Sequence, residues 1–488
     1  MRSIPRLISA LTLAVVLGGC SPYLVNGKLD RFDKDAGYRY GKLSGEGNSD
    51  EIFVILAFSG GGTRAAAFSF GVMEGLQGAV YNAPGGPRRF LEDVDVISSV
   101  SGGSFTAAYY ALFPEKFFAT FPFAFLHRNV QGDLIRRALW PPNWFRLAAS
   151  DFDRINLAAE YYDETIFEHK TFAELIAKRR KPYIILNATD MTLGRRFEFS
   201  QDQFDLLCSD LASVKVATAV AASSAFPGLL SPLTVKNFAA DGCKYERPQW
   251  LTDALDRNNP IRRYANARDL WSYQDPKLKR EYIHLLDGGL GDNIGLRGPY
   301  VSLSGNDSNW SLYDRINQRS VRRIVVISAN AKTNPSKDWD HKQAAPGILD
   351  VLSLVTGGPM DNYSFETVQL IRDTFDRLKD EEKAWTDCKQ LLQDQCSAKM
   401  PGVLSPVDFY ASELSFDSLA DEDLRLCMEN LPTSFYLPED TVTLVRQVAR
   451  LLLMQSPDFG RIMRELDGAW QPSAVQIDPS LRARVCPS

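Results

Sequence analysis

The sequence predicts an α/β protein with a mainly parallel central sheet, followed by a largely helical C-terminal region. The first observation is that two apolar strand patterns, at residues 51–58 and 94–100, each run into a glycine-rich turn and then a helical pattern. Strand–loop–helix units repeated in this way favour parallel strands. The second observation is that apolar residues recur at helical spacing over 364–388 and 441–454.

Length and composition fit a globular protein with a large core. The chain has 488 residues, of which 45% are hydrophobic, and a net charge of −5. Its basic clusters, at residues 88–89 and 178–181, are short and far apart, so we expect no nucleic-acid partner. We place the main domain at 51–330 and a helical region, packed on it, at 331–488.

The first 19 residues have the pattern of an export signal. Two arginines precede the short apolar run 7–17, which ends in Gly18-Gly19-Cys20. Small residues before a cysteine resemble the bacterial lipoprotein box, in which the cysteine is acylated and becomes the N-terminus. Acyl chains on Cys20 would anchor the protein in the cell envelope. By analogy, Ser21 after this cysteine favours the outer membrane; an ordinary cleaved signal peptide is the alternative.

Residues 20–50 are rich in Gly and Asp, as a tether would be. The strand pattern 51–58 follows and leads into Gly60-Gly61-Gly62-Thr63-Arg64. This loop matches neither the P-loop nor the dinucleotide-binding pattern. We assign Gly60, Gly61 and Gly62 to an oxyanion hole, in which the N–H groups of Gly61 and Gly62 would each contribute on the order of 3 kcal/mol. Arg64 would secure the loop, meet a phosphate, or simply begin the helix.

The second turn presents a candidate nucleophile. The strand 94–100 rises to Ser101, and a helical pattern follows Gly103. A sharp strand-to-helix turn exposes the serine hydroxyl and requires small residues two positions before and after it. Ser99 and Gly103 meet this requirement, although glycine is usual at the position of Ser99. An ordinary Ser/Gly-rich loop is the alternative interpretation of this stretch.

Two insertions interrupt the α/β pattern. The aromatic-rich stretch 113–169 indicates either a lid or rim that enters a membrane interface, or ordinary core. The segment 236–280 is charged and contains two tryptophans, and we interpret it as surface elaboration. Between the insertions, residues 182–190 and 195–200 have the pattern of a hairpin.

A serine nucleophile needs a base, usually a histidine. His284 lies three residues before Asp287 in a strand pattern, where alternation points the two side chains to opposite faces. We therefore expect Asp287, at a strand end before Gly288 and Gly289, to act directly on the serine. Asp241 also precedes a glycine, but it lacks a preceding strand and neighbours Cys243, which suggests a loop closed by a disulfide.

The combination of motifs resembles the patatin-like phospholipase family: G-G-G-T-R at 60–64, S-V-S-G-G at 99–103, A-F-P-G at 225–228 and D-G-G at 287–289. The resemblance covers about 51–330, and the segment 412–453, with N-L-P-T-S-F at 430–435, is similar to the helical end of bacterial members. It implies a three-layer α/β/α fold and a Ser–Asp dyad without histidine. Ser101 would attack an ester carbonyl, and Asp287 would accept its proton and later activate water. Ala65 and Ser99 depart from the usual glycines, and both are small.

We therefore expect a membrane-anchored acyl hydrolase that acts on phospholipids or other lipid esters and uses neither metal nor cofactor. No calcium-binding loop is recognisable, and the scattered cysteines and histidines do not suggest zinc. One alternative is a catalytically silent envelope lipoprotein that binds lipid or a protein, although it would have no need of Ser101, Asp287 and the glycine loop together. A histidine-dependent hydrolase is the other.

Six cysteines remain besides Cys20, so three disulfides are plausible in an exported chain. Local spacing suggests Cys208 with Cys243, Cys388 with Cys396 and Cys427 with Cys486. Fifteen pairings are possible, and the sequence alone does not choose among them.

Overall fold

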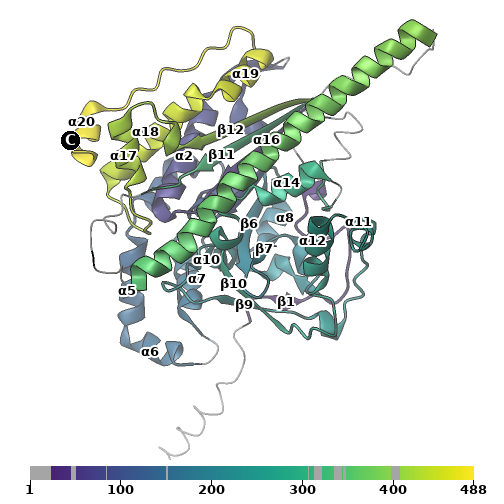
Figure 1. The fold of residues 1–488 in the computed structure, drawn as a ribbon. Helices are drawn as coiled ribbons and strands as arrows, with labels where there is room; N and C mark the ends of the chain where they lie inside the picture. Colours follow the sequence, from purple (N-terminus) through teal and green to yellow (C-terminus); the bar gives the residue numbers. More distant parts are fainter. Residues whose placement is uncertain are drawn as a thin grey trace, which may run out of the picture.

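A computed structural model describes residues 24–44, 51–83, 85–149, 152–305, 307–312, 321–334, 343, 348–396 and 407–487. Its centre is an eight-stranded sheet in the order β12-β11-β2-β5-β6-β10-β9, with β7 paired to β6 (Figure 1). Its strands are β2 (Ile52–Phe58), β5 (Val94–Val100), β6 (Tyr183–Asp190), β7 (Arg195–Glu198), β9 (Leu233–Lys236), β10 (Tyr282–Asp287), β11 (Arg323–Asn330) and β12 (Asp408–Ser415).

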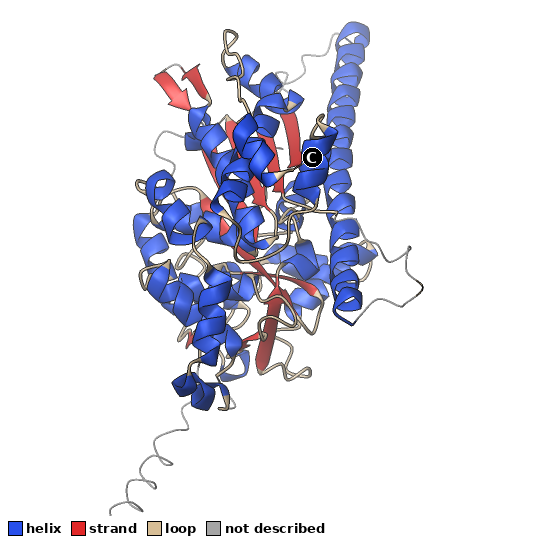
Figure 2. Cartoon of the chain, turned by 90° about the vertical axis from the view of Figure 1, so that its left-hand side faces the viewer, coloured by secondary structure: helices blue, strands red, loops and turns tan. Residues whose placement is uncertain are grey.

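Neighbouring strands from β12 to β6 are parallel, whereas β7, β9 and β10 pair in the antiparallel direction. All seven residues of β2 and of β5 are buried, as expected for strands covered on both faces. Figure 2 shows the strands running between helices on both sides. The predicted α/β class with a mainly parallel sheet and the hairpin of β6 with β7 are confirmed.

Two of the helices that cover the sheet come directly after a strand in the chain. Helix α2 (Gly62–Gly78) follows β2, and α3 (Gly102–Leu112) follows β5. Helix α2 packs against α3 and against α18 (Glu439–Gln455). The other helices are α4 (Phe117–Phe121), α5 (Val130–Leu139), α6 (Pro141–Leu147), α7 (Arg154–Thr165), α8 (Phe172–Lys178), α9 (Gln201–Asp205), α10 (Val216–Ser223), α11 (Gln249–Ala254), α12 (Ile261–Trp271), α13 (Gly289–Asp292), α14 (Arg297–Ser304), α16 (Ile348–Cys396), α17 (Glu422–Glu429), α19 (Pro457–Leu466) and α20 (Pro479–Val485).

The expected tether is wrong for residues 24–44, which fold onto the domain. Strand β1 (Gly27–Lys28) pairs with β8 (Ser209–Asp210), and Tyr38 is only 2% exposed. An Arg39 Nη lies 2.6 Å from a carboxylate oxygen of Asp205. Aromatic packing and a buried ion pair thus outweigh the local abundance of Gly and Asp, which composition alone does not reveal. The predicted signal peptide and Cys20 lie outside the described residues.

The C-terminal region is helical as expected, but it also completes the sheet. Strand β12 pairs in parallel with β11 over all eight of its residues, which the sequence analysis did not anticipate. Helix α16 runs along one side of the molecule as a single long rod (Figures 1 and 2). None of the helices in the described ranges has the length and apolar character of a membrane span.

The aromatic-rich stretch is core in one part and exposed in another. Phe117, Phe121 and Phe125 are buried, and their rings contact one another or the rings of Phe70 and Phe105. Other side chains of the stretch point outward, and the large exposed ones on and around α5 and α6 are Phe123, Ile135, Leu139, Trp140, Trp144 and Phe145. Part of the stretch is therefore core and part is an exposed apolar surface.

Two of the suggested disulfides are confirmed, Cys208–Cys243 and Cys427–Cys486. The suggested disulfide between Cys388 and Cys396 is wrong, because Cys388 is a free, exposed thiol on α16. Eight residues along one straight helix place two Cα atoms about 12 Å apart, which is farther than a disulfide reaches. The short spacing suggested a local disulfide, whereas the chain there is helical.

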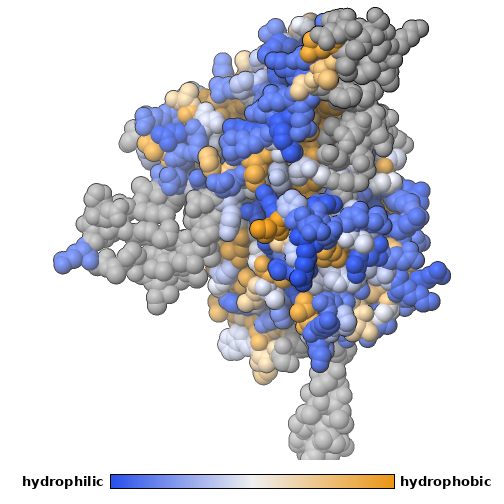
Figure 3. Space-filling model, turned by 45° about the vertical axis from the view of Figure 1, so that its right-hand side comes forward, coloured by the Kyte–Doolittle hydropathy of each residue, from blue (hydrophilic) through white to orange (hydrophobic). Residues whose placement is uncertain are grey.

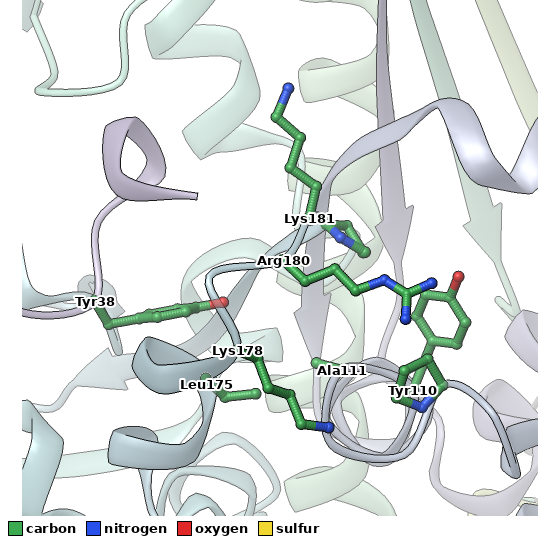
Figure 4. Close-up of a pocket in the computed structure, with 9 residues that line it drawn as sticks. Tyr38, Tyr110, Ala111, Leu175, Lys178, Arg180 and Lys181 are labelled. Atoms are coloured by element: carbon green, nitrogen blue, oxygen red, sulfur yellow. The ribbon is translucent and has the colours of Figure 1, made fainter. Parts of the chain in front are cut away.

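A small cavity of about 20 Å³ lies where β6 begins, at the end of the sheet away from Ser101. Figure 4 shows Lys178, Arg180 and Lys181 around it, together with Tyr38 and Tyr110. The ammonium group of Lys178 donates to the carbonyl oxygen of Leu112 at the end of α3. This cavity holds about one water molecule and has no room for a lipid.

Candidate active site

The sharp turn predicted after β5 is present. Ser101 lies between β5 and α3 with φ of 50° and ψ of −119°, a conformation that is strained for a residue with a side chain. The backbone N–H of Gly103 donates to the Ser59 carbonyl oxygen at 3.2 Å. A Cβ on Gly103 would lie 2.6 Å from the Cβ of Phe58. A larger residue would therefore push α3 away from β2, which explains the need for glycine two positions after Ser101.

Ser101 and Asp287 meet although 186 positions separate them in the chain. Asp287 ends β10, and its carboxylate accepts a hydrogen bond from the Gly289 backbone N–H at 2.8 Å. The Ser101 hydroxyl is close enough to this carboxylate to lower its pKa. Ser101 is 6% exposed and Asp287 3%. The bond from Gly289 holds one oxygen of the carboxylate in place.

Burial raises the pKa of Asp287 from 3.8 to about 6, while the hydrogen bonds from Gly289 and Ser101 act in the opposite direction. A carboxyl group with this pKa is largely ionised at neutral pH. It is nevertheless more basic than an exposed aspartate, which suits it to accept a proton from a hydroxyl. The pair has the geometry and the electrostatics of a nucleophile beside its base.

The glycine loop lies against the turn at Ser101. Gly61 and Gly62 have positive φ values of 134° and 61°, and α2 begins at Gly62. A Cβ on Gly102 would lie 2.0 Å from the Gly62 carbonyl oxygen and 2.9 Å from its nitrogen. The loop and the turn are thus in direct backbone contact, beside the serine hydroxyl.

Gly60, which we assigned to the oxyanion hole, has no free N–H to donate there. Its N–H already donates to the Asn293 carbonyl oxygen at 3.0 Å. A Cβ on Gly60 would lie 2.7 Å from the Asn293 side-chain oxygen and 3.3 Å from the Ser101 Cβ, so Gly60 gives room to the nucleophile. The candidate oxyanion donors are therefore the N–H groups of Gly61 and Gly62.

Arg64 secures the loop, which was one of the three roles considered for it. It is buried and donates to the carbonyl oxygens of Ala331 at 3.0 Å and Leu431 at 2.7 Å, and to the Thr433 hydroxyl at 3.1 Å. The Thr63 N–H donates to the Ser434 carbonyl oxygen at 2.8 Å. The segment 430–435 thus braces the glycine loop, so the C-terminal region contributes to the site.

Three supporting residues were missed by the sequence analysis. Ser223, at the end of α10, accepts from the Ser101 N–H at 2.9 Å and donates to the Asn187 carbonyl oxygen at 2.6 Å. The Ser223 carbonyl oxygen accepts from Gly288 N–H at 3.0 Å. Asn187 donates to Ser98 and to the carbonyl oxygen of Ser99, each at 3.0 Å. Asn293 is the third; only its position shortly after the Asp287 motif could have suggested it.

Gly288 and Gly289 are also close-packed. A Cβ on Gly288 would lie 2.2 Å from the Asn187 carbonyl oxygen, and one on Gly289 would lie 2.1 Å from the Met360 methyl carbon of α16. These contacts explain why two glycines follow Asp287. They also place α16 over this side of the site.

The competing bases lie elsewhere. His284 is exposed and within 3.0 Å of the Thr234 hydroxyl, on the opposite side of β10 from Asp287. His127 is near Glu439, and His169 is hydrogen-bonded to Asp163. His341 lies outside the described residues. Asp241 is exposed and 4.0 Å from Lys28, in the loop closed by the Cys208–Cys243 disulfide.

Comparison with known proteins places the chain in a family. Residues 56–300, half of the chain, match the model of the family described as patatin-like phospholipase. Among solved structures, human GIVD cytosolic phospholipase A2 is 13% identical with a TM-score of 0.32. The match covers 63% of this chain and 48% of that one, so the chain spans about half the length of that enzyme.

VipD from Legionella pneumophila is 10% identical with a TM-score of 0.25, and the match covers 93% of this chain and 77% of that one. No curated protein matches the chain. The family match over residues 56–300 includes Ser101, Asp287 and the glycine loop at 60–64. The chain belongs to the patatin-like phospholipase family.

Proposed function

We propose that the protein is a membrane-anchored lipid esterase of the phospholipase A type that works through a Ser101–Asp287 dyad. The observation that carries this proposal is that the strained turn at Ser101, the buried Asp287 carboxylate and the positive-φ loop of Gly61 and Gly62 come together in one place. A serine hydroxyl alone is a poor nucleophile, and an adjacent base overcomes this.

In the first half of the reaction, Ser101 Oγ attacks the ester carbonyl carbon while its proton passes to Asp287. The carbonyl oxygen becomes negatively charged, and the N–H groups of Gly61 and Gly62 stabilise it. When the C–O bond breaks, the proton on Asp287 passes to the leaving alcohol. The acyl group then remains on Ser101.

In the second half, Asp287 accepts a proton from a water molecule, which attacks the acyl-enzyme carbonyl. Collapse of that intermediate releases the fatty acid, and the proton returns from Asp287 to Ser101 Oγ. The base is therefore ionised at the start of each half-reaction, which its pKa of about 6 permits at neutral pH.

Membrane attachment is proposed on two grounds. Cys20 stands in a lipoprotein-box context, and its acylation would anchor the mature chain. The exposed apolar residues on and around α5 and α6 include Phe145, which is 83% exposed, and Trp140, which is 61% exposed. Exposed Trp and Phe side chains are suited to the interfacial region of a bilayer. We place the anchored protein in the cell envelope, at the outer membrane.

The test is the release of fatty acid from phospholipid vesicles and from a panel of other lipid esters by the purified mature protein. We expect release by the wild type, loss of at least a thousandfold in Ser101→Ala and Asp287→Asn, and little change in Asp241→Asn or His284→Gln. Absence of release by the wild type from every ester would contradict the enzyme proposal. Loss of activity in His284→Gln would instead indicate a histidine-dependent mechanism.

Anchoring is tested separately by fractionating cells that express the full chain. We expect the wild type in the membrane fraction and Cys20→Ser free of membranes. Equal membrane association of the two proteins would contradict attachment through Cys20.

A further inference from the structure

A second cavity, of about 430 Å³, lies apart from Ser101 and Asp287, neither of which lines it. Strand β7 and helices α9, α11, α12 and α14 contribute to its walls, with one residue from α16. The insertion 236–280, for which the sequence suggested no role, provides α11 and α12. This volume is within the range of small-molecule binding sites, roughly 300 to 1,000 Å³.

The lining of this cavity is amphipathic. Its aromatic side includes Tyr245, Trp250 and Trp310. Its polar side carries six arginines: Arg195, Arg196, Arg262, Arg263, Arg297 and Arg377. Hydrophilic and hydrophobic residues lie side by side on the face of the molecule that includes this region (Figure 3). Such a cavity suits a ligand with an anionic group and an apolar or aromatic part.

The carboxylates of the cavity do not neutralise all of these arginines. Asp269 lies 3.2 Å from Arg195, and Asp307 lies 2.9 Å from Arg263. The two remaining carboxylates are also engaged, Glu198 by Arg196 and Asp202 by Arg39, which is outside the cavity.

Arg262 and Arg297 are left without a carboxylate within 4.0 Å among the residues that the structure describes. Arg262 lies over the ring of Tyr300, and Arg297 over the ring of Tyr363, each with its guanidinium carbon 4.9 Å from the ring centroid. The Arg297 Nε is buried and has no hydrogen-bond partner. The two guanidinium groups therefore keep donors available for a ligand.

Both arginines line the cavity at α14, Arg297 as part of this helix and Arg262 by contact with its Tyr300. Tyr300, over which Arg262 lies, is three residues after Arg297 on α14, and such positions are neighbours on a helix surface, with Cβ atoms about 5 to 6 Å apart. Arg196 and Asp292 are both close enough to Arg297 to interact with it electrostatically. Burial lowers the pKa of Arg196 to about 10, Asp292 opposes this shift, and the positive charge of Arg297 adds to it.

We propose that this cavity binds a phosphate-bearing ligand, with the phosphate held by Arg262 and Arg297 and the organic part against the aromatic wall. Two guanidinium groups with no carboxylate within 4.0 Å among the described residues match a doubly charged phosphate better than a single carboxylate, and their planar donors suit bidentate contacts with phosphate oxygens. The phosphate belongs either to a lipid head group or to a free phosphate ester. The site is separate from the proposed esterase chemistry and does not depend on it.

The test is isothermal titration calorimetry on the mature chain carrying Ser101→Ala, so that ester probes are not consumed. The probes are inorganic phosphate, glycerol 3-phosphate, monomeric dihexanoyl phosphatidic acid and hexanoate. We expect saturable binding of at least one phosphate probe, and at least tenfold weaker binding of hexanoate. Adding Arg262→Gln or Arg297→Gln should weaken phosphate binding at least tenfold, whereas Arg136→Gln, at an exposed position on α5, should not.

The source of the phosphate follows from the probe that binds best. Tighter binding of phosphatidic acid than of glycerol 3-phosphate, lost in Arg262→Gln, assigns the site to a lipid head group. Equal or tighter binding of the water-soluble phosphates assigns it to a free phosphate ester. No saturable phosphate binding, hexanoate binding as tight as phosphate binding, or binding unchanged by Arg262→Gln would each overturn the proposal. Because Arg262 is exposed, this variant decides the matter even if Arg297→Gln does not fold.

Discussion

Replacing Asp287 by asparagine should stabilise the protein at neutral pH while it abolishes hydrolysis. Asparagine has nearly the same shape, its side-chain oxygen can still accept from the Gly289 N–H, and its NH2 group can donate to the Ser101 hydroxyl oxygen. It removes only the buried charge. The wild-type chain bears the cost of that charge because the folded state raises the pKa of Asp287 from 3.8 to about 6.

The size and sign of the effect follow from linkage. Between pH 4 and 6 the unfolded chain loses a proton that the folded chain keeps, so the wild-type free energy of unfolding falls as the pH rises. Each pKa unit corresponds to about 1.36 kcal/mol. The pKa difference of about two between the folded and unfolded states of Asp287 therefore corresponds to about 3 kcal/mol in the free energy of unfolding. Asp287→Asn should therefore match the wild type near pH 3.5 and exceed it by about 3 kcal/mol at pH 8, with the difference developing between pH 4 and 6.

Urea unfolding of the two proteins at several pH values measures this difference, and other titrating groups cancel because both proteins contain them. Asp241→Asn is the matched control, since Asp241 also precedes a glycine but is exposed, and it should show no such pH dependence. A difference that does not change with pH, or an Asp287→Asn variant less stable than the wild type at pH 8, would refute the reasoning.

Three further predictions concern activity and membrane binding. The kcat/KM for a soluble ester should fall tenfold per pH unit below about 6 and level off above it, because Asp287 acts only when ionised; a pH–rate profile without this acid limb would contradict its role as base. Gly62→Ala should lower kcat at least a hundredfold, because the alanine Cβ would lie 2.3 Å from the Ser434 carbonyl oxygen and displace a candidate oxyanion donor. A near-normal kcat in steady-state kinetics on the folded variant would argue against this donor. The double variant Trp144→Ser and Phe145→Ser removes two exposed apolar side chains of α6, so cosedimentation of the unacylated protein with vesicles should fall at least fivefold. Hydrolysis of a soluble ester should be unchanged. Undiminished cosedimentation would mean that α6 does not face the bilayer.

Short-range patterns in the sequence predicted the parts of the site that depend on local geometry. The strand-to-helix turn at Ser101 requires small neighbours, and the strand end at Asp287 is marked by the two glycines after it. Alternation along β10 also predicted that His284 would point away from Asp287, as it does. In each case neighbouring residues dictate the conformation.

Long-range contacts were not predictable in this way. Nothing around Ser223 indicates that it accepts from the Ser101 N–H, and nothing around residues 430–435 indicates that they brace Arg64. Strand β12 lies in a region of helical patterns, and the packing of Tyr38 overrides a tether-like composition. Such partners are chosen by tertiary packing, which a single sequence does not encode as a local pattern.

The central claim is that the Asp287 carboxylate activates the Ser101 hydroxyl as the nucleophile. Its most direct test is peptide mapping by mass spectrometry after reaction with a fluorophosphonate probe, which forms a covalent bond to an activated serine. We predict one adduct, on Ser101, formed at least a hundredfold more slowly in Asp287→Asn. An adduct on a different serine, or labelling of Ser101 at the wild-type rate in Asp287→Asn, would contradict the claim.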